Sequence, residues 1–167
     1  MIDGHTLISK EDDLSFRGFM EREVYSKIDA DLVMPESQRI FPEPGKENEI
    51  MELIHNLGGI DICFGGVGIN GHIAFNEPGT PFDSTVRVSE IDEVTKSVGT
   101  KYFTNVPQLS GGITIGLKEI CASKNIILIV FGEHKQEIIK KFLDSPVTTT
   151  LPASVLKTIP DAQFWYV

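Results

Sequence analysis

The chain has 167 residues, 41% of them hydrophobic, and its mean hydropathy is −0.02. These values are typical of one folded domain with its own core and not of a disordered chain. The net charge of −9 argues against a nucleic-acid-binding protein, which normally carries a basic field. A small anionic ligand is still compatible, because a phosphate site needs only a few local cations and backbone amides.

The sequence carries no sign of a membrane or secretory protein. No apolar run approaches membrane-spanning length, and the opening MIDGHTLISKEDD lacks the regions of a signal peptide. We therefore expect a cytoplasmic protein. Cys63 and Cys121 lie in apolar surroundings, which favours buried free thiols over a metal pair or a disulfide.

The N-terminal part predicts two helices joined by a surface connection. Leu14–Lys27 carries apolar residues at helical spacing, and Glu47–Leu57 is a second amphipathic segment, closed by the glycine pair Gly58-Gly59. Between them, Ala30–Lys46 holds three prolines and few periodic positions, which is typical of a loop.

Strands and helices then alternate. Ile60–Gly65 and Asn125–Phe131 predict buried parallel strands, Glu133–Leu143 a helix and Ala162–Val167 a final strand. This order is that of an open parallel α/β sheet. Three strands are few for a sheet covered on both faces, so we expect either extra strands or a missing part of the fold. The candidate extra strands are Thr85–Ser89 and Gly112–Ile115.

Ligand sites in open α/β sheets form where the carboxyl ends of strands run into loops. The stretch FGGVGINGHIAFNE, Phe64–Glu77, follows the first strand, and GEHK, Gly132–Lys135, follows the second. The four glycines of the first loop exceed what a tight turn needs and indicate close backbone approach to a ligand. GGVGING also fits a dinucleotide fingerprint, but no clear helix or suitably placed acid follows, so we expect no nucleotide cofactor.

His72 is the candidate catalyst of this loop. A lone histidine beside apolar residues is often structural, and Glu77 lies in a turn sequence where it is often merely solvated. However, a carboxylate against one imidazole nitrogen fixes the tautomer and raises basicity, which suits an acid/base near neutral pH. We therefore favour a functional pair, with the polar Asn70 beside it.

The sequence resembles the glucosamine-6-phosphate deaminase/isomerase family. GVGINGHIAFNEPG is similar to the family signature, and the flanking segments LSFRGFM, VRV, TKYF, ITIGLKEI, VFGEHK and TTTLPASVLKTIPDA follow in the expected order. The resemblance runs from about Leu14 to Val167. It implies a Rossmann-like enzyme of amino-sugar catabolism that converts glucosamine 6-phosphate to fructose 6-phosphate and ammonia without a nucleotide or metal cofactor.

The resemblance also implies roles for single residues. His72 falls on the histidine that opens the sugar ring, and Glu77 on the glutamate that orients it. Asn70 takes a position where some members carry aspartate; an amide can hold the imidazole but brings no charge. The implied substrate-binding residues are Lys135 and Lys101 at the phosphate, the latter replacing an expected arginine, and Gly66 through its backbone.

The sequence departs from the family at its N-terminus. The family's first strand and Gly-Ser/Thr phosphate loop have no counterpart, so we expect an N-terminally truncated fold. The base that takes the C2 proton would lie before Met1 or at Asp3, where Gly4 replaces the usual glutamate neighbour. We expect residues 1–167 to form one incomplete α/β domain with an exposed apolar sheet edge or face, which self-associates as a homo-oligomer or binds a partner segment that completes the sheet. The alternatives are a 6-phosphogluconolactonase-like hydrolase and a non-catalytic remnant that binds sugar phosphate or a partner chain.

Overall fold

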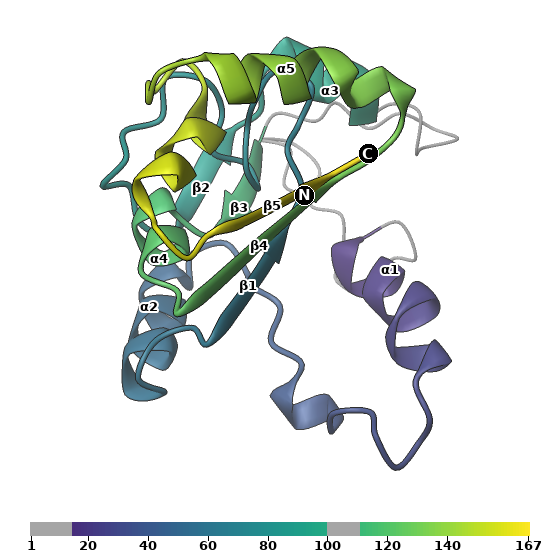
Figure 1. Ribbon diagram of the computed structural model, residues 1–167. Coiled ribbons are helices and arrows are strands. Elements are labelled where there is room, and N and C mark those ends of the chain that lie inside the picture. Colours follow the sequence, from purple (N-terminus) through teal and green to yellow (C-terminus); the bar gives the residue numbers. More distant parts are fainter. Residues whose placement is uncertain (1–14, 100–110) are drawn as a thin grey trace.

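The computed structural model describes residues 15–99 and 111–167 (Figure 1). The elements in chain order are α1 (Phe16–Glu23), η1 (Tyr25–Lys27), η2 (Glu36–Gln38), α2 (Glu47–Asn56), β1 (Ile62–Gly65), β2 (Arg87–Glu90), α3 (Glu93–Gly99), β3 (Gly111–Thr114), α4 (Leu117–Cys121), β4 (Asn125–Val130), η4 (Glu133–Lys135), α5 (Gln136–Asp144), η5 (Pro152–Thr158) and β5 (Gln163–Tyr166), where η marks a 3-10 helix. The longest α-helix, α2, has 10 residues, and none in the described ranges has the length and hydropathy of a membrane span.

The helices expected before the first strand are confirmed. The Ser15 hydroxyl accepts a hydrogen bond from the amide of Gly18 and so caps the start of α1. Helix α2 ends at Asn56, and Gly58 and Gly59 follow its cap with left-handed φ angles of 80° and 99°. The amide of Gly59 closes back on the carbonyl of Ile54 at 2.9 Å, as a glycine cap requires.

The three predicted strands form one parallel sheet in the order β1-β4-β5. Phe64 of β1 pairs with Ile127 of β4, and Ile129 of β4 pairs with Trp165 of β5. The central strand is the one with the longest apolar run, as expected for a parallel sheet. The carboxyl ends of β1 and β4 therefore lie side by side.

The segments expected to widen this sheet do form strands, but they pair with each other. β2 and β3 make a separate antiparallel ribbon, so of the two expected alternatives the one with extra strands in the parallel sheet is wrong. Buried Asn76 explains the placement, since its amide group donates to the carbonyl of Ile115 and accepts from the Arg87 guanidinium, both at 2.9 Å. The ribbon is thereby tied to the loop after β1 instead of to a sheet edge.

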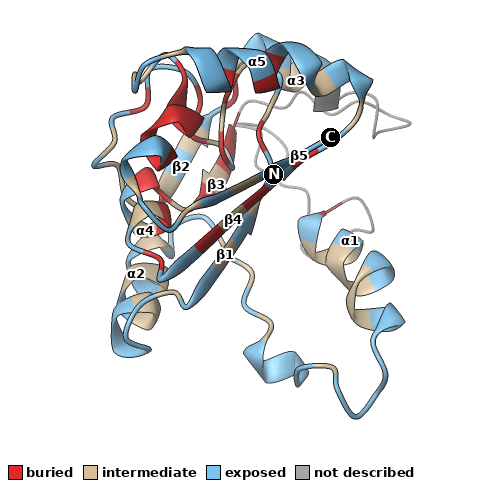
Figure 2. Ribbon diagram, viewed as in Figure 1, coloured by how far each residue is buried: buried red, intermediate tan, exposed pale blue. Residues whose placement is uncertain are grey.

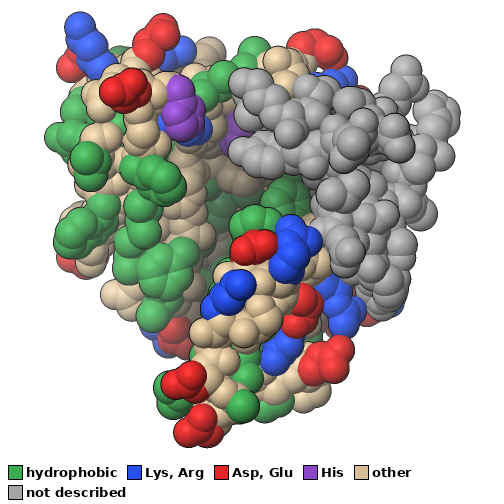
Figure 3. Space-filling model, turned by 90° about the vertical axis from the view of Figure 1, so that its right-hand side faces the viewer, with side chains coloured by type: hydrophobic (Ala, Val, Ile, Leu, Met, Phe, Trp, Pro, Cys, Tyr) green, Lys and Arg blue, Asp and Glu red, His purple; other side chains and the backbone are tan. Residues whose placement is uncertain are grey.

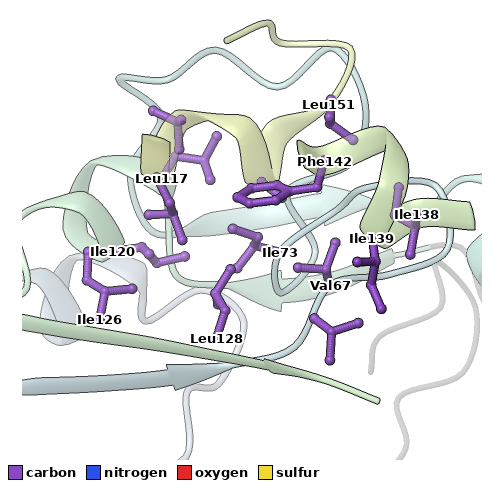
Figure 4. Packing of buried hydrophobic residues seen from close by; sticks show 14 residues of the cluster. Val67, Ile73, Leu117, Ile120, Ile126, Leu128, Ile138, Ile139, Phe142 and Leu151 are labelled. Carbon is purple, nitrogen blue, oxygen red and sulfur yellow. The ribbon is translucent and has the colours of Figure 1, made fainter. Parts of the chain in front are cut away.

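The hydrophobic core lies on one face of the parallel sheet, beneath α4, α5 and η5 (Figures 2 and 4). Alternate residues of β4 point into it, and Leu117 and Leu151 are fully buried above them. Figure 4 shows Val67 and Ile73 of the loop after β1 packed into the same cluster, so the core anchors that loop.

The other face of the sheet is apolar and open in the described part of the chain. Phe64, Phe131 and Trp165 are 67%, 71% and 61% exposed, and Ile62 and Ile129 are about half exposed. In Figure 1, α1 lies on this side of the sheet, away from α5. The exposed fractions show that these side chains are nevertheless not buried. The expectation that Ile60–Gly65 is a buried strand is therefore wrong here.

Exposed apolar surface of this kind promotes association. We predict that the chain self-associates as its concentration rises, which light scattering measures. Replacing Phe131 and Trp165 together by serine should reduce the association. Leu57→Ser, at an isolated position that is 73% exposed at the end of α2, is the matched control. A compact monomer at high concentration would contradict the prediction.

Candidate active site

The loop after β1 turns back on itself at its glycines. The Gly68 amide donates to the carbonyl of His72, and the Gly71 amide donates to the carbonyl of Gly68, each at 2.9 Å. Gly71 has a φ of 93°, and a Cβ there would lie 2.2 Å from a methyl group of Leu151. Only glycine fits this position, so the turn presses against the core and sets the direction of the next residue, His72.

A second glycine makes room for the histidine itself. A Cβ on Gly68 would lie between 2.2 and 2.5 Å from three atoms of the His72 ring. The corresponding Cβ on Gly66 would meet only the carbonyl oxygen of Ile129, at 3.7 Å, which is an ordinary contact. Gly68 thus makes room for a side chain of the protein itself, and the predicted close approach of a ligand to this loop, at Gly66 included, stays a prediction.

Oxygen atoms surround one nitrogen of His72. Nδ1 lies 2.7 Å from Oδ1 of Asn70, 3.1 Å from the Thr95 hydroxyl and 3.4 Å from Oε2 of Glu77. An amide oxygen and a carboxylate accept hydrogen bonds only, so this arrangement favours a proton on Nδ1. The other ring nitrogen, Nε2, then carries the lone pair that a reacting group can use.

Glu77 is buried, with only 7% of the residue exposed. Burial by itself raises the pKa of its carboxyl, but hydrogen bonds from His72 and Asn70, together with the charge of His72, outweigh burial and leave the pKa below its usual value. Glu77 is therefore ionised at neutral pH. Its Oε1 is buried without a hydrogen-bond partner among the described residues.

The site includes two further residues, Asp92 and Thr95, that the sequence analysis did not identify. Asp92 precedes α3 and accepts a hydrogen bond from the Asn70 amide at 2.8 Å, while Thr95 contacts the imidazole. Asp92 also caps α3, since its Oδ1 accepts from the Thr95 amide at 2.9 Å. From the sequence, Asp92 is recognisable only as a residue at the start of a helix. That position does not indicate a contact with Asn70, 22 residues earlier.

Lys135 lies at the same edge of the sheet as the histidine loop. Its ammonium group donates to the carbonyl of Val67 at 2.7 Å, and burial lowers the pKa of this half-buried lysine. Figure 3 shows the molecule from the right-hand side of Figure 1, with histidine and basic side chains near the top and hydrophobic side chains below them. The expectation that His72 and Lys135 open onto one edge is confirmed.

Other candidate sites carry less chemistry. Lys101 and Asp3 lie outside the described residues. Cys63 and Cys121 are free, as predicted, but only partly buried, and this burial raises the pKa of both thiols. No group of three or more His, Cys, Asp or Glu side chains within residues 15–99 and 111–167 is arranged to hold a metal ion.

A pocket of about 340 Å³ lies away from His72, between β5, α5 and η5. Its lining is mostly apolar, and its one ionisable side chain, Lys157, donates to the carbonyls of Leu143 and Ser145. It therefore lacks a group poised for acid/base work, and the strand-end loops remain the better candidate.

The room that Gly68 leaves for the imidazole is testable. Gly68→Ala adds a methyl group within 2.5 Å of the ring, so we predict that the ring swings away and loses its hydrogen bond to Asn70. Nitrogen NMR of the imidazole measures this directly. Gly66→Ala, where the added methyl has ordinary space, should leave the ring signals in place. An unchanged His72 spectrum in Gly68→Ala would contradict the geometry.

Known proteins are similar in sequence to nearly the whole of this chain. The family model described as glucosamine-6-phosphate isomerases/6-phosphogluconolactonase matches residues 10–165. Glucosamine-6-phosphate deaminase of Bacillus pumilus is 34% identical, over 96% of this chain and 68% of its own length. The deaminase of Shouchella clausii is 35% identical, over 96% of this chain and 66% of its own length. The chain thus spans about two thirds of the length of these relatives.

Solved structures agree. A structure described as a monomeric glucosamine-6-phosphate deaminase of the NagB superfamily has a TM-score of 0.88 at 30% identity, covering 95% of this chain and 67% of its own. A 6-phosphogluconolactonase of Trypanosoma cruzi has a TM-score of 0.65 at 16% identity, covering 95% and 66%, and shows the shared fold alone. The fold, the loop geometry and these likenesses together show that the chain belongs to the glucosamine-6-phosphate isomerase/6-phosphogluconolactonase family.

Proposed function

We propose that this protein is a glucosamine-6-phosphate deaminase, the activity named for its curated relatives. The observation that carries the proposal is the arrangement at His72. One ring nitrogen is held at 2.7 Å by Asn70 and lies 3.4 Å from a buried, ionised Glu77, which leaves the other nitrogen for a substrate. Such a histidine is suited to moving protons between oxygen atoms near neutral pH.

The proposed first step is the opening of the sugar ring. His72 Nε2 takes the proton of the C1 hydroxyl, the bond between C1 and the ring oxygen breaks, and the proton passes to that oxygen. The product is the open-chain aldehyde, and the histidine returns to its starting state. While the imidazole holds the extra proton, the carboxylate of Glu77 at 3.4 Å stabilises its positive charge.

We propose Lys135 as a ligand of the substrate phosphate. Its ammonium group donates one of its three protons to the carbonyl of Val67, which leaves two protons for phosphate oxygens. A nearby dianion favours the charged form of a lysine whose pKa is lowered by burial. Lys101 and the backbone of Gly66 complete the proposed substrate-binding set.

The later steps need a base at C2. Removal of the C2 proton and protonation of the aldehyde oxygen give an enol with the amino group on C2. Protonation of C1 then gives an iminium ion at C2, and addition of water releases ammonia and leaves fructose 6-phosphate. Within residues 1–167, the candidate for this base is Asp3, on its sequence position.

The proposal extends to the setting of the chain. We propose one α/β domain over residues 1–167, working in the cytoplasm, because a charged sugar phosphate does not cross a membrane unaided. We also propose a homo-oligomer joined through the open sheet face. The rings of Phe64, Phe131 and Trp165 alone present roughly 400 Å² there, taking about 200 Å² for each aromatic side chain. A standard interface buries about 800 Å² per partner, so a second copy could cover a patch of this kind.

The assay of two variants separates catalysis from binding. We predict that His72→Gln lowers turnover of glucosamine 6-phosphate by about two to four orders of magnitude, with affinity nearly intact, because a positioned acid/base is lost. Lys135→Ala should instead weaken binding roughly 10- to 150-fold, as expected for a lost hydrogen bond to a charged group. Lys140→Ala, an exposed lysine of α5, is the matched control.

The same assay decides between the alternatives. Ammonia release lost in His72→Gln supports the deaminase. Hydrolysis of 6-phosphogluconolactone without ammonia release from glucosamine or galactosamine 6-phosphate would favour the lactonase, which the family description also includes. Binding of sugar phosphates without either reaction would leave only the non-catalytic remnant.

A further inference from the structure

Asn70 stands between three polar side chains. Its amide nitrogen donates to Oε2 of Glu77 and to Oδ2 of Asp92, both at 2.8 Å, and its oxygen lies 2.7 Å from Nδ1 of His72. The carboxamide therefore links the imidazole to two carboxylates, one from its own loop and one from the start of α3.

The two carboxylates, together with the backbone amide of His72, which donates to the Asn70 oxygen at 3.2 Å, decide which way the carboxamide points. Its oxygen and nitrogen are nearly equal in size, so shape alone does not distinguish the two orientations. If the group were turned over, its oxygen would face two carboxylate oxygens at 2.8 Å, all of them acceptors. Its NH₂ group would then face Nδ1 of His72 and would demand a lone pair there. The observed orientation instead demands a proton on Nδ1.

We propose that Asp92 is a positioning residue that fixes the tautomer of His72 through Asn70. By holding the amide nitrogen, Asp92 turns the amide oxygen towards Nδ1, keeps the proton there and leaves the lone pair on Nε2. The consequence for catalysis rests on the proposed role of His72 as the ring-opening base. The tautomer of His72 itself does not depend on that proposed role.

Helix capping alone does not account for Asp92. Its two carboxylate oxygens have separate partners: Oδ1 accepts from the amide of Thr95, and Oδ2 accepts from Asn70. Burial raises the pKa of Asp92, but the hydrogen bonds from Thr95 and Asn70 outweigh it and lower the pKa below its usual value. Asp92 is therefore ionised at neutral pH and accepts at both oxygens. Substitutions can separate the two tasks because they use different atoms.

The test compares three variants by nitrogen NMR of the His72 ring and by steady-state kinetics. Asp92→Asn keeps an oxygen for the cap but sets an NH₂ group against that of Asn70. Asp92→Ser keeps a cap and removes the partner of Asn70 without adding a donor. Glu93→Gln removes the neighbouring exposed carboxylate of α3, whose side chain is 88% exposed, and is the matched control.

We expect Asp92→Asn to move the proton of His72 away from Nδ1 and to lower kcat roughly 10- to 100-fold with little change in KM, by analogy with the partners that orient metal-binding histidines. Asp92→Ser should act in the same direction more weakly, and Glu93→Gln should match the parent in both readouts. Circular dichroism should show the helices retained in all three. The same His72 tautomer in Asp92→Asn as in the parent would overturn the inference, whatever happens to kcat.

The outcome is separable from that of the proposed function. If the parent releases no ammonia from glucosamine 6-phosphate, yet Asp92→Asn shifts the His72 proton, the positioning role stands and the proposed function fails. If the parent is active but Asp92→Asn changes neither the tautomer nor kcat, the proposed function stands and the positioning role fails.

Discussion

A buried carboxylate organises this site. Glu77 is 7% exposed and ionised, and a charge in that position is tolerated only where hydrogen-bond donors compensate for lost water. Asn70 and His72 supply donors from the same loop, and Thr95 adds its hydroxyl from α3. The hydrogen bonds that Glu77 requires thus hold His72 in place, with Nδ1 turned towards the carboxylate. The reactive nitrogen, Nε2, is on the other side of the ring.

The core gives this arrangement its rigidity. Val67 and Ile73 pack into the hydrophobic cluster on either side of the glycine turn, and Gly71 lies against Leu151 (Figure 4). The loop after β1 is therefore part of the packed interior at both ends, with the polar groups between them. Sites built on such supported segments hold their geometry better than free loops do.

The charge pattern also accounts for asparagine at position 70, where the family resemblance allows aspartate. With Glu77 and Asp92 each 2.8 Å from the side-chain nitrogen, an aspartate would bring three carboxylates together and raise the pKa of at least one. An amide avoids this repulsion and donates to both neighbours. In this chain, Asp92 supplies the second negative charge from α3.

The parts of this account that sequence predicts are those with local patterns. Asn70, His72 and Glu77 lie within one loop, and Lys135 follows a recognisable apolar strand, so the rule for strand ends finds them. Asp92 reads only as a helix cap, because its link to Asn70 spans 22 residues and depends on how α3 packs. The pairing of β2 with β3 was missed for a similar reason, since buried Asn76 and Arg87 decide it. The expectation of a buried strand at Ile60–Gly65 was wrong because a strand that is apolar on both faces normally predicts burial on both, whereas Phe64 is 67% exposed.

The central claim is that His72, oriented by Asn70 and Glu77, opens the sugar ring. Exchange between the α and β anomers of glucosamine 6-phosphate passes through the open chain, so exchange NMR measures ring opening without requiring the later steps. The account predicts that the protein accelerates this exchange well above the buffer rate and that His72→Gln returns it to that rate. Exchange that is equally fast with His72→Gln, or no faster with the parent protein than in buffer alone, would contradict it.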